Sequence, residues 1–224
     1  MEEHEKRRAL IEAMLPEVPF DGWSRAALRA AAAEAGIDES EALTFFRTPR
    51  EMVEGFSHWA DDRMLDALET QNLEAMRVRD RVATAERTRL RVLEPHREAV
   101  RRALAALAMP QNMATGLILL YRTVDAIWYA TGDRSTDFNF YTKRGLLAGV
   151  HAAATLYWLD DRSEGGADTA AFLDRRLTEV MSIPKLRARL GESLAWLPNP
   201  FRLMRGAAAL GERQLARRAS RRGH

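Results

Sequence analysis

The sequence contains no cysteine, which excludes disulfide bonds and every metal site or nucleophile that depends on a thiolate. Histidine spacings typical of metal sites, such as HxxxH and HxH, are also missing, because the histidines are scattered at positions 4, 58, 96, 151 and 224. We therefore expect neither a metal ion nor another cofactor.

Long apolar runs are absent as well. The best candidate, MATGLILLYRTVDAIWYA, is interrupted by Arg122 and Asp125, so we expect no segment that spans a bilayer. The amino terminus, MEEHEKRRAL, carries acids at positions 2, 3 and 5 and no apolar run, which argues against a secretory signal or a transit peptide. These features predict a cytoplasmic chain, or one that lies peripherally on the inner face of a membrane.

Strand-like alternation is almost missing, and Pro, Gly and capping residues divide the chain into segments with helical periodicity. With 224 residues, 46% of them hydrophobic, the chain can bury a substantial core. We predict an all-α protein with helices over residues 3–15, 24–35, 39–46, 49–70, 73–93, 96–108, 111–131, 141–160, 168–182 and 200–219.

Residues 31–53, AAAEAGIDESEALTFFRTPREMV, have the outline of a helix-turn-helix. A DNA-binding unit of this kind gains affinity from Lys, Arg and helix amino termini that neutralise phosphates. Here Arg47 and Arg50 are outnumbered, which leaves residues 36–54 with a net charge of −3; the acids are Asp38, Glu39, Glu41, Glu51 and Glu54. The segment therefore predicts the fold of a DNA-binding unit that binds no nucleic acid.

Two later segments are apolar or small over more than one helical face. Residues 111–131 carry an apolar stripe and further apolar residues beside it, which predicts burial on several sides or a cavity. Gly145 and Gly149, with neighbouring alanines, let another helix or a lipid chain approach the backbone, although tight helix packing is the simpler account of either glycine alone. We predict a lipid cavity lined by some of Leu117, Leu120, Val124, Trp128, Leu147, Val150 and Leu156.

The net charge of +2 hides a strongly basic carboxyl terminus. Residues 200–224 sum to +6, so residues 1–199 sum to −4. On a helical wheel, residues 200–219 separate apolar from Arg side chains, a pattern typical of a helix that lies in a membrane interface. The alternatives are a terminal helix docked on the core and a disordered basic end. We predict membrane contact through Trp196, Leu197, Phe201, Arg202, Met204, Arg205 and Leu215.

Two motifs resemble known families. The three-helix unit with FFRTPREMVEGF, leading into a long helix, resembles the TetR repressors. Residues 131–161, TGDRSTDFNFYTKRGLLAGVHAAATLYWLDD, resemble much more specifically the ubiquinone-biosynthesis lipid-binding accessory family, coenzyme Q protein nine and its bacterial relatives. This likeness extends more weakly over residues 10–220, and Phe140 stands where that family often has Trp. The resemblance implies a TetR-like fold without repressor function.

The resemblance also implies an auxiliary protein that binds isoprenoid or quinone lipids and presents them to the di-iron hydroxylase acting on demethoxyubiquinone. Aromatic side chains beside basic ones are typical of binding hot spots, although the same aromatic residues can instead anchor the loop to the core. Carried over to this chain, the partner-binding patch comprises Asp137, Phe140, Tyr141, Lys143 and Arg144.

We therefore expect a helix-turn-helix-like subdomain, a helical lipid-binding domain and a basic amphipathic tail over residues 1–50, 51–195 and 196–224. A TetR-like fold predicts a homodimer. The leading function is a non-enzymatic accessory protein of ubiquinone biosynthesis, and the alternative is a ligand-responsive repressor of the TetR type. An enzyme ranks third, because the nearest thing to a catalytic cluster is His58 with Asp61 and Asp62 on one helix, a common surface pattern.

Overall fold

The computed structural model describes the backbone of residues 2–132 and 138–190 and the side chains of residues 2–132 and 143–180. All regular structure within these ranges is helical, which confirms the all-α prediction. The chain divides into two units, residues 1–181 and 182–224, and both hydrophobic cores lie in the first. The predicted tail helix over residues 200–219, with all the tail residues expected to touch a membrane, lies outside the described part.

The helices follow the predicted segments closely, with short 3₁₀ turns between some of them. Two differences are a short extra helix α2 and an α10 that runs to Leu190 rather than residue 182. The elements are α1 (Glu3–Met14), α2 (Val18–Asp21), α3 (Arg25–Ala35), α4 (Glu39–Phe45), α5 (Pro49–Glu69), α6 (Val78–Leu93), α7 (Arg97–Leu107), α8 (Met113–Ala130), α9 (Phe138–Asp160) and α10 (Ala167–Leu190).

Helix ends are set by the residues that the sequence suggested. The Ser24 hydroxyl accepts a hydrogen bond from the backbone N–H of Ala27 and caps α3, which ends at Gly36 in the left-handed conformation with φ 65°. Thr48 caps α5 in the same way, and Pro49 occupies its first turn, where a missing N–H costs nothing. These caps fix the two turns of the helix-turn-helix outline.

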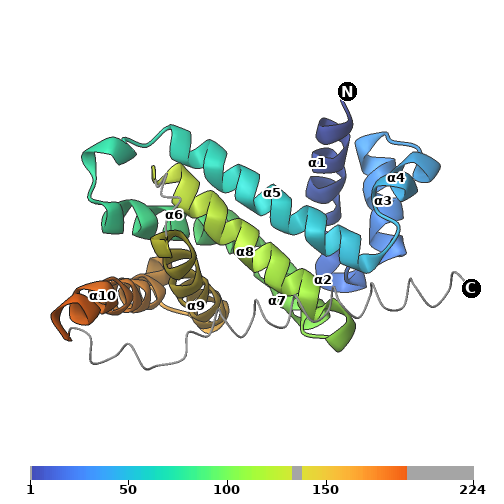
Figure 1. The fold of residues 1–224 in the computed structure, drawn as a ribbon. Coiled ribbons are helices and arrows are strands. Elements are labelled where there is room, and N and C mark those ends of the chain that lie inside the picture. The colour runs from blue at the N-terminus through green and yellow to red at the C-terminus, as the bar shows by residue number, and fades with distance from the viewer. Residues whose placement is uncertain (1, 133–137, 191–224) are drawn as a thin grey trace, which may run out of the picture. The chain divides into compact units, whose positions relative to one another are not determined.

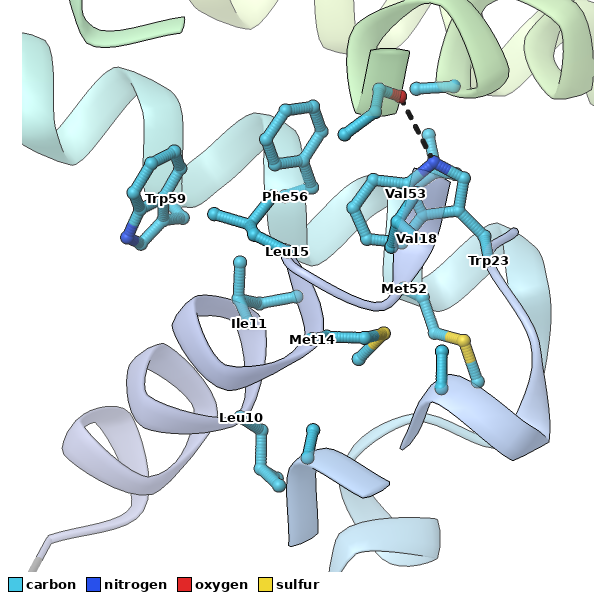
Figure 2. Packing of buried hydrophobic residues seen from close by; sticks show 14 of the residues in the cluster. Leu10, Ile11, Met14, Leu15, Val18, Trp23, Met52, Val53, Phe56 and Trp59 are labelled. Atoms are coloured by element: carbon cyan, nitrogen blue, oxygen red, sulfur yellow. Dashed lines mark hydrogen bonds between the residues drawn. The ribbon is translucent and has the colours of Figure 1, made fainter. Parts of the chain in front are cut away.

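The first hydrophobic core joins the amino-terminal helices to α5, α6 and α7 (Figures 1 and 2). Leu10 and Met14 of α1 and Met52 of α5 are fully buried in this core. The Trp23 indole N–H donates a hydrogen bond of 3.2 Å to the carbonyl of Ala99 in α7, the dashed line in Figure 2. This bond and the shared core attach the helix-turn-helix outline to the helices that follow it.

The second core lies further along α5, where that helix packs with α6, α8, α9 and α10. Figure 1 shows α8 running alongside α5. Met64 of α5, Ile127 of α8 and Leu147 of α9 are almost completely buried there. The carboxyl-terminal half of α8 therefore contributes to a packed core, whereas residues 113–119 at its amino-terminal end lie outside that core.

Candidate functional site

A cavity of about 550 Å³ lies among α5, α6, α7, α8 and α9. This volume falls in the range of natural small-molecule sites, which are mostly apolar with a few placed polar groups. Its wall is largely aliphatic, with one aromatic ring and several small residues; the apolar residues that line it include Val53, Phe56, Leu93, Val100, Ala103, Leu104, Leu107, Gly116, Leu119, Leu120, Ala152 and Leu156.

Each helix gives the cavity one stripe at helical spacing. On α8, the residues that line it are Gly116, Leu119, Leu120 and Thr123, which recur after three or four positions and so share one face. Residues 100, 103, 104 and 107 do the same on α7, and residues 151, 152, 155 and 156 on α9. The cavity is therefore a product of amphipathic periodicity rather than of a loop.

A buried polar network lies in one part of the wall. The Arg89 Nε donates a 2.9 Å hydrogen bond to Asp61 Oδ1, and the Thr123 hydroxyl donates to the same carboxylate at 2.9 Å. Asp61 is only 2% exposed, so these two donors are what make burial of its charge tolerable. The network fixes α5, α6 and α8 to one another at the cavity wall.

A second polar pair joins α6 to α9. His151 Nδ1 lies 2.8 Å from Glu86 Oε2, and both side chains are buried. One turn further along α9, Thr155 is also buried, and its hydroxyl has no hydrogen-bond partner within the described part of the chain. His151 and Thr155 both line the cavity, whereas Glu86 lies behind His151.

The residues around His58 do not converge. The Asp61 carboxylate pairs with Arg89, whereas the Asp62 carboxylate lies 3.6 Å from His4 Nε2. Burial lowers the pKa of His58, and the Arg122 guanidinium lowers it further. Among the described residues, no group of three or more His, Asp or Glu side chains could hold a metal ion.

The predicted lipid-binding residues divide into three groups. Leu120 and Leu156 line the cavity. Leu117 is 65% exposed on the outer side of α8. The other four, Val124, Trp128, Leu147 and Val150, pack into the second core instead, because that part of α8 and α9 faces α5, α6 and α10.

Sequence reasoning missed the contributions of α5, α6 and α7 to the wall, including Phe56, Leu93 and Val100. The available signal was the amphipathic pattern of residues 97–107, where small and branched apolar residues share one face. Such a pattern predicts a buried face, but it does not say whether another helix or an open space lies opposite.

The predicted partner-binding patch needs one correction. Arg144 is only 4% exposed, and its Nε lies 2.6 Å from Asp125 Oδ1 of α8, so it holds two helices together rather than facing a partner. Lys143 is partly exposed, with its ammonium 5.6 Å from the centre of the Trp128 ring. Phe140 and Tyr141 belong to α9, but their side chains, like Asp137, lie outside the described part.

Exposed apolar residues lie on α8 next to those that line the cavity. Leu117 and Ile118 follow Gly116, and Tyr121 follows Leu120. Met109 and Met113, which precede them in the sequence, are exposed as well. No single described helix is long and apolar enough to cross a membrane. Residues 78–107 and 110–130, two segments with a bend of 95° between them, are together long and apolar enough by length and composition alone.

The acidic helix-turn-helix residues are engaged locally. Glu39 of α4 lies 2.8 Å from Arg29 Nε of α3, and Glu41 lies 2.5 Å from Lys6 Nζ of α1. Hydrogen bonds from the Ser40 hydroxyl and backbone N–H hold the pKa of Asp38 below its ordinary value, so this carboxylate stays ionised. Two bases that could meet phosphates are thus paired with acids of the same unit.

Comparison with known proteins gives a consistent assignment. Residues 113–184 match the model of the COQ9 family. The chain is 33% identical over 188 residues to the mitochondrial ubiquinone biosynthesis protein COQ9 of Rattus norvegicus, covering 81% of this chain and 60% of the relative. Identity to the Homo sapiens protein of the same name is 31%, covering 81% and 59%. The chain thus spans less than two thirds of the length of these relatives.

Among solved structures, the TetR transcriptional regulator of Nitrosomonas europaea superposes with a TM-score of 0.64. Identity is 20%, and the match covers 79% of this chain and 98% of the regulator, so the likeness concerns the fold. The TetR-like fold and the resemblance carried by residues 131–161 are both confirmed.

Proposed function

Because the chain belongs to the COQ9 family, we propose that it is a non-enzymatic accessory protein of ubiquinone biosynthesis that binds an isoprenoid or quinone-type lipid. The cavity among α5 to α9 is the observation that carries this proposal. Its volume and aliphatic wall suit an apolar chain, and burial of such a chain is favourable by about 25 cal/mol for each Å² removed from water.

Delivery to the demethoxyubiquinone hydroxylase is the second part of the proposal. We assign the partner contact to Phe140, Tyr141 and Lys143 of α9 and to Asp137, which precedes that helix in the sequence. Arg144 is removed from the patch because it is buried. Replacing Phe140 or Tyr141 by Lys should weaken hydroxylase binding by about 30-fold or more, since a truncated hot-spot residue costs about 2 kcal/mol or more. Calorimetric titration against the hydroxylase checks this, and circular dichroism verifies the fold.

Membrane association is the third part. We assign it to residues 196–224, through Trp196, Leu197, Phe201, Met204 and Leu215 on the apolar side and Arg202 and Arg205 on the basic side. Deletion of residues 200–224 should abolish flotation with anionic liposomes. Flotation of the truncated chain equal to that of the full chain would contradict this assignment.

The relatives are mitochondrial by name, which supports a protein that is not secreted and that is associated with an organelle. For this chain we propose a peripheral position on the inner face of the membrane, and a homodimer as in other TetR-like folds.

A ligand-responsive repressor is the alternative, favoured by the superposition with the TetR regulator. The net charge of −3 over residues 36–54, and the pairing of Lys6 and Arg29 with acids of α4, argue against it. Duplex DNA should not bind with sub-micromolar affinity at about 150 mM salt, where non-specific attraction is screened. Tight binding that survives deletion of residues 200–224 would favour the repressor.

Mass spectrometry of lipids extracted from the purified full chain tests the proposal as a whole. The expected result is a quinone or polyprenyl species at close to one molecule per protein. A protein that carries no lipid, and that binds no prenylated probe when one is added, would refute lipid binding as its function.

A further inference from the structure

A second, smaller cavity lies among α1, α5 and α8, and none of the described residues lines both cavities. Its volume is about 150 Å³, below the range of sites that enclose a whole drug-sized ligand. A cavity of this size can hold one small molecule or ion. Its apolar side includes Ile11 and Trp59, which are labelled in Figure 2. We call this cavity the α1 pocket.

Basic side chains predominate among the polar residues that line the α1 pocket. Arg7 and Arg8 come from α1 and Arg122 from α8, whereas Asp62 of α5 is the one acid among the described lining residues. The Arg8 guanidinium already forms ion pairs at 3.2 and 3.5 Å with carboxylates of α1 and α5. The Asp62 carboxylate lies 3.6 Å from His4 Nε2. Two arginines of the pocket are therefore left against a single carboxylate.

Arg7 is held by groups that carry no negative charge. Its guanidinium lies 4.9 Å from the centre of the Phe46 ring, and its Nη1 donates a long hydrogen bond of 3.4 Å to the carbonyl of Phe45. The side chain is half-buried, and no described residue forms an ion pair with it. Because a partly desolvated cation without a counter-charge is costly, an anion gains more from pairing with Arg7 than with a fully exposed arginine.

Phe46 lies in place because α5 has a glycine beside it. A Cβ at Gly55 would lie 2.6 Å from Phe46 Cε1, so only a residue without a side chain lets the buried ring lie there. Both residues line the α1 pocket, and Phe46 belongs to the first core. The surface on which Arg7 rests is thus fixed by core packing, and a ligand does not have to order it.

Arg122 and His58 provide the other cationic groups. Arg122 is exposed on α8 and forms no ion pair with a described residue. Burial lowers the pKa of the half-buried His58, and Arg122 and Arg7 lower it further, against the opposite effect of Asp61 and Asp62. An anion between the two arginines would offset their charge and favour the protonated form of His58.

We propose that the α1 pocket binds a doubly charged oxyanion, such as inorganic phosphate or the phosphate group of a phosphomonoester. Arg7 and Arg122 donate hydrogen bonds to its oxygens, because planar guanidinium groups match the geometry of phosphate. His58 takes up a proton from solvent and donates a third bond. The anion bridges α1 of the helix-turn-helix outline and α8. This site is separate from the lipid cavity and does not depend on the proposed function.

Calorimetric titration of the full chain with anions at constant ionic strength tests the proposal, since constant ionic strength keeps general screening equal. The probes are phosphate, sulfate, glycerol 3-phosphate, acetate and chloride. We expect phosphate and sulfate to bind at least about tenfold more tightly than acetate, because the second charge adds a charge-assisted hydrogen bond. Tighter binding of glycerol 3-phosphate than of phosphate identifies a phosphomonoester as the ligand, and the reverse order identifies free phosphate.

Two substitutions locate the anion. Arg7→Gln and Arg122→Gln should each lower phosphate affinity by about tenfold or more. Arg122 is exposed, so its variant should fold normally even if the loss of Arg7 disturbs the packing on Phe46. Arg25→Gln is the matched control and should keep wild-type affinity, since Arg25 is an exposed arginine of α3, has no ion pair among the described residues and lies outside the pocket.

The basic residues 200–224, with a net charge of +6, are the same in all three variants. A loss of affinity confined to the Arg7 and Arg122 variants therefore separates the α1 pocket from general attraction by the tail.

Nuclear magnetic resonance of the histidine ring protons gives a readout other than affinity. Sulfate should raise the pKa of His58 in the wild-type chain, because a bound anion offsets the arginines that lower it. The same addition should leave the pKa of His58 almost unchanged in Arg122→Gln. His58→Gln assigns the resonance by removing it.

Equal affinity for phosphate and acetate would overturn the proposal, as would wild-type phosphate affinity in both arginine variants. A pKa of His58 that sulfate leaves unchanged in the wild type would also contradict it. If Arg25→Gln loses as much affinity as Arg122→Gln, the attraction is non-specific and the proposal fails. Lipid content of the purified chain enters none of these outcomes, so failure of this site and failure of lipid binding are distinguishable.

Discussion

The core beneath α1 and the wall of the cavity are both built from amphipathic helices, but they differ in the size of the side chains that meet. In the core, Leu10, Met14 and Phe46 are large side chains that are fully buried. At the cavity, Ala103, Gly116 and Ala152 occupy positions where a large residue would fill the gap. Protein interiors normally pack as densely as organic crystals. The same helical pattern therefore gives a packed core where the facing side chains are large and a cavity where they are small.

Creating a cavity in the core beneath α1 should have the largest effect on the free energy of unfolding. Phe46→Ala removes a fully buried ring and should lower the free energy of unfolding by about 3–5 kcal/mol. Phe20→Ala is the control, since that ring is 82% exposed and its loss should be almost neutral. Denaturant titration measures both, and similar values for the two variants would show that Phe46 is not part of a tightly packed core.

Breaking the buried pair of Asp61 and Arg89 at the cavity wall should cause the next largest loss of stability. Asp61→Asn keeps the shape of the side chain but leaves the buried Arg89 without its counter-charge, which should cost about 2–3 kcal/mol. Asp174→Asn removes a carboxylate from a partly exposed pair with Arg87 and should cost less than about 1 kcal/mol. Equal losses would mean that burial does not strengthen the wall network.

A glycine-to-alanine substitution should change the free energy of unfolding in opposite directions at the core and at the cavity wall. A Cβ at Gly55 would lie 2.6 Å from Phe46 Cε1, so Gly55→Ala should destabilise by about 1–3 kcal/mol. At Gly116 the nearest atom is Leu107 Cβ at 3.5 Å, an ordinary contact, so Gly116→Ala should stabilise by up to about 1 kcal/mol through helix propensity. Destabilisation by Gly116→Ala would indicate a wall without spare room.

The smallest expected effect on stability concerns the turn between α9 and α10, which lies outside the cavity wall. Hydrogen bonds from the Ser163 and Thr169 hydroxyls lower the pKa of Asp161 below its ordinary value of 3.8. A lowered carboxyl pKa contributes stability that is present above the ordinary value and is lost as pH falls through the lowered one.

Asp161→Asn should therefore lose stability at neutral pH and show a weaker decline in acid than the wild type. Unfolding curves recorded from pH 7 down to strong acid measure this, with the exposed neighbour Asp160→Asn as control. Parallel curves for wild type and Asp161→Asn would remove Asp161 from the acid response.

Helix positions could be predicted from the sequence because their determinants are local. Ser24, Gly36 and Thr48 act on residues a few positions away, so the periodic segments and their caps suffice. The short α2 was missed because four residues are too few to show a period. Its sequence, VPFD, reads equally well as a turn.

The cavity could be predicted only in part, because its wall depends on contacts between helices distant in sequence. Leu120 of α8 and Leu156 of α9 line the cavity. Val124 and Trp128 lie on α8 as well, but they pack into the second core. The burial of Arg144 depends on Asp125, nineteen positions earlier on another helix, and no local pattern indicates that pair. Apolar periodicity identifies a buried face without saying what lies opposite.

The central claim, that the small residues of the wall leave room for a lipid, is tested most directly by filling that room. Native mass spectrometry of the purified Ala152→Phe variant should show no bound lipid, with thermal stability equal to or above that of the wild type because the ring occupies an existing space. Ala114→Phe, on α8 but outside the wall, should retain wild-type lipid content. Wild-type lipid content in a folded Ala152→Phe protein would contradict the account.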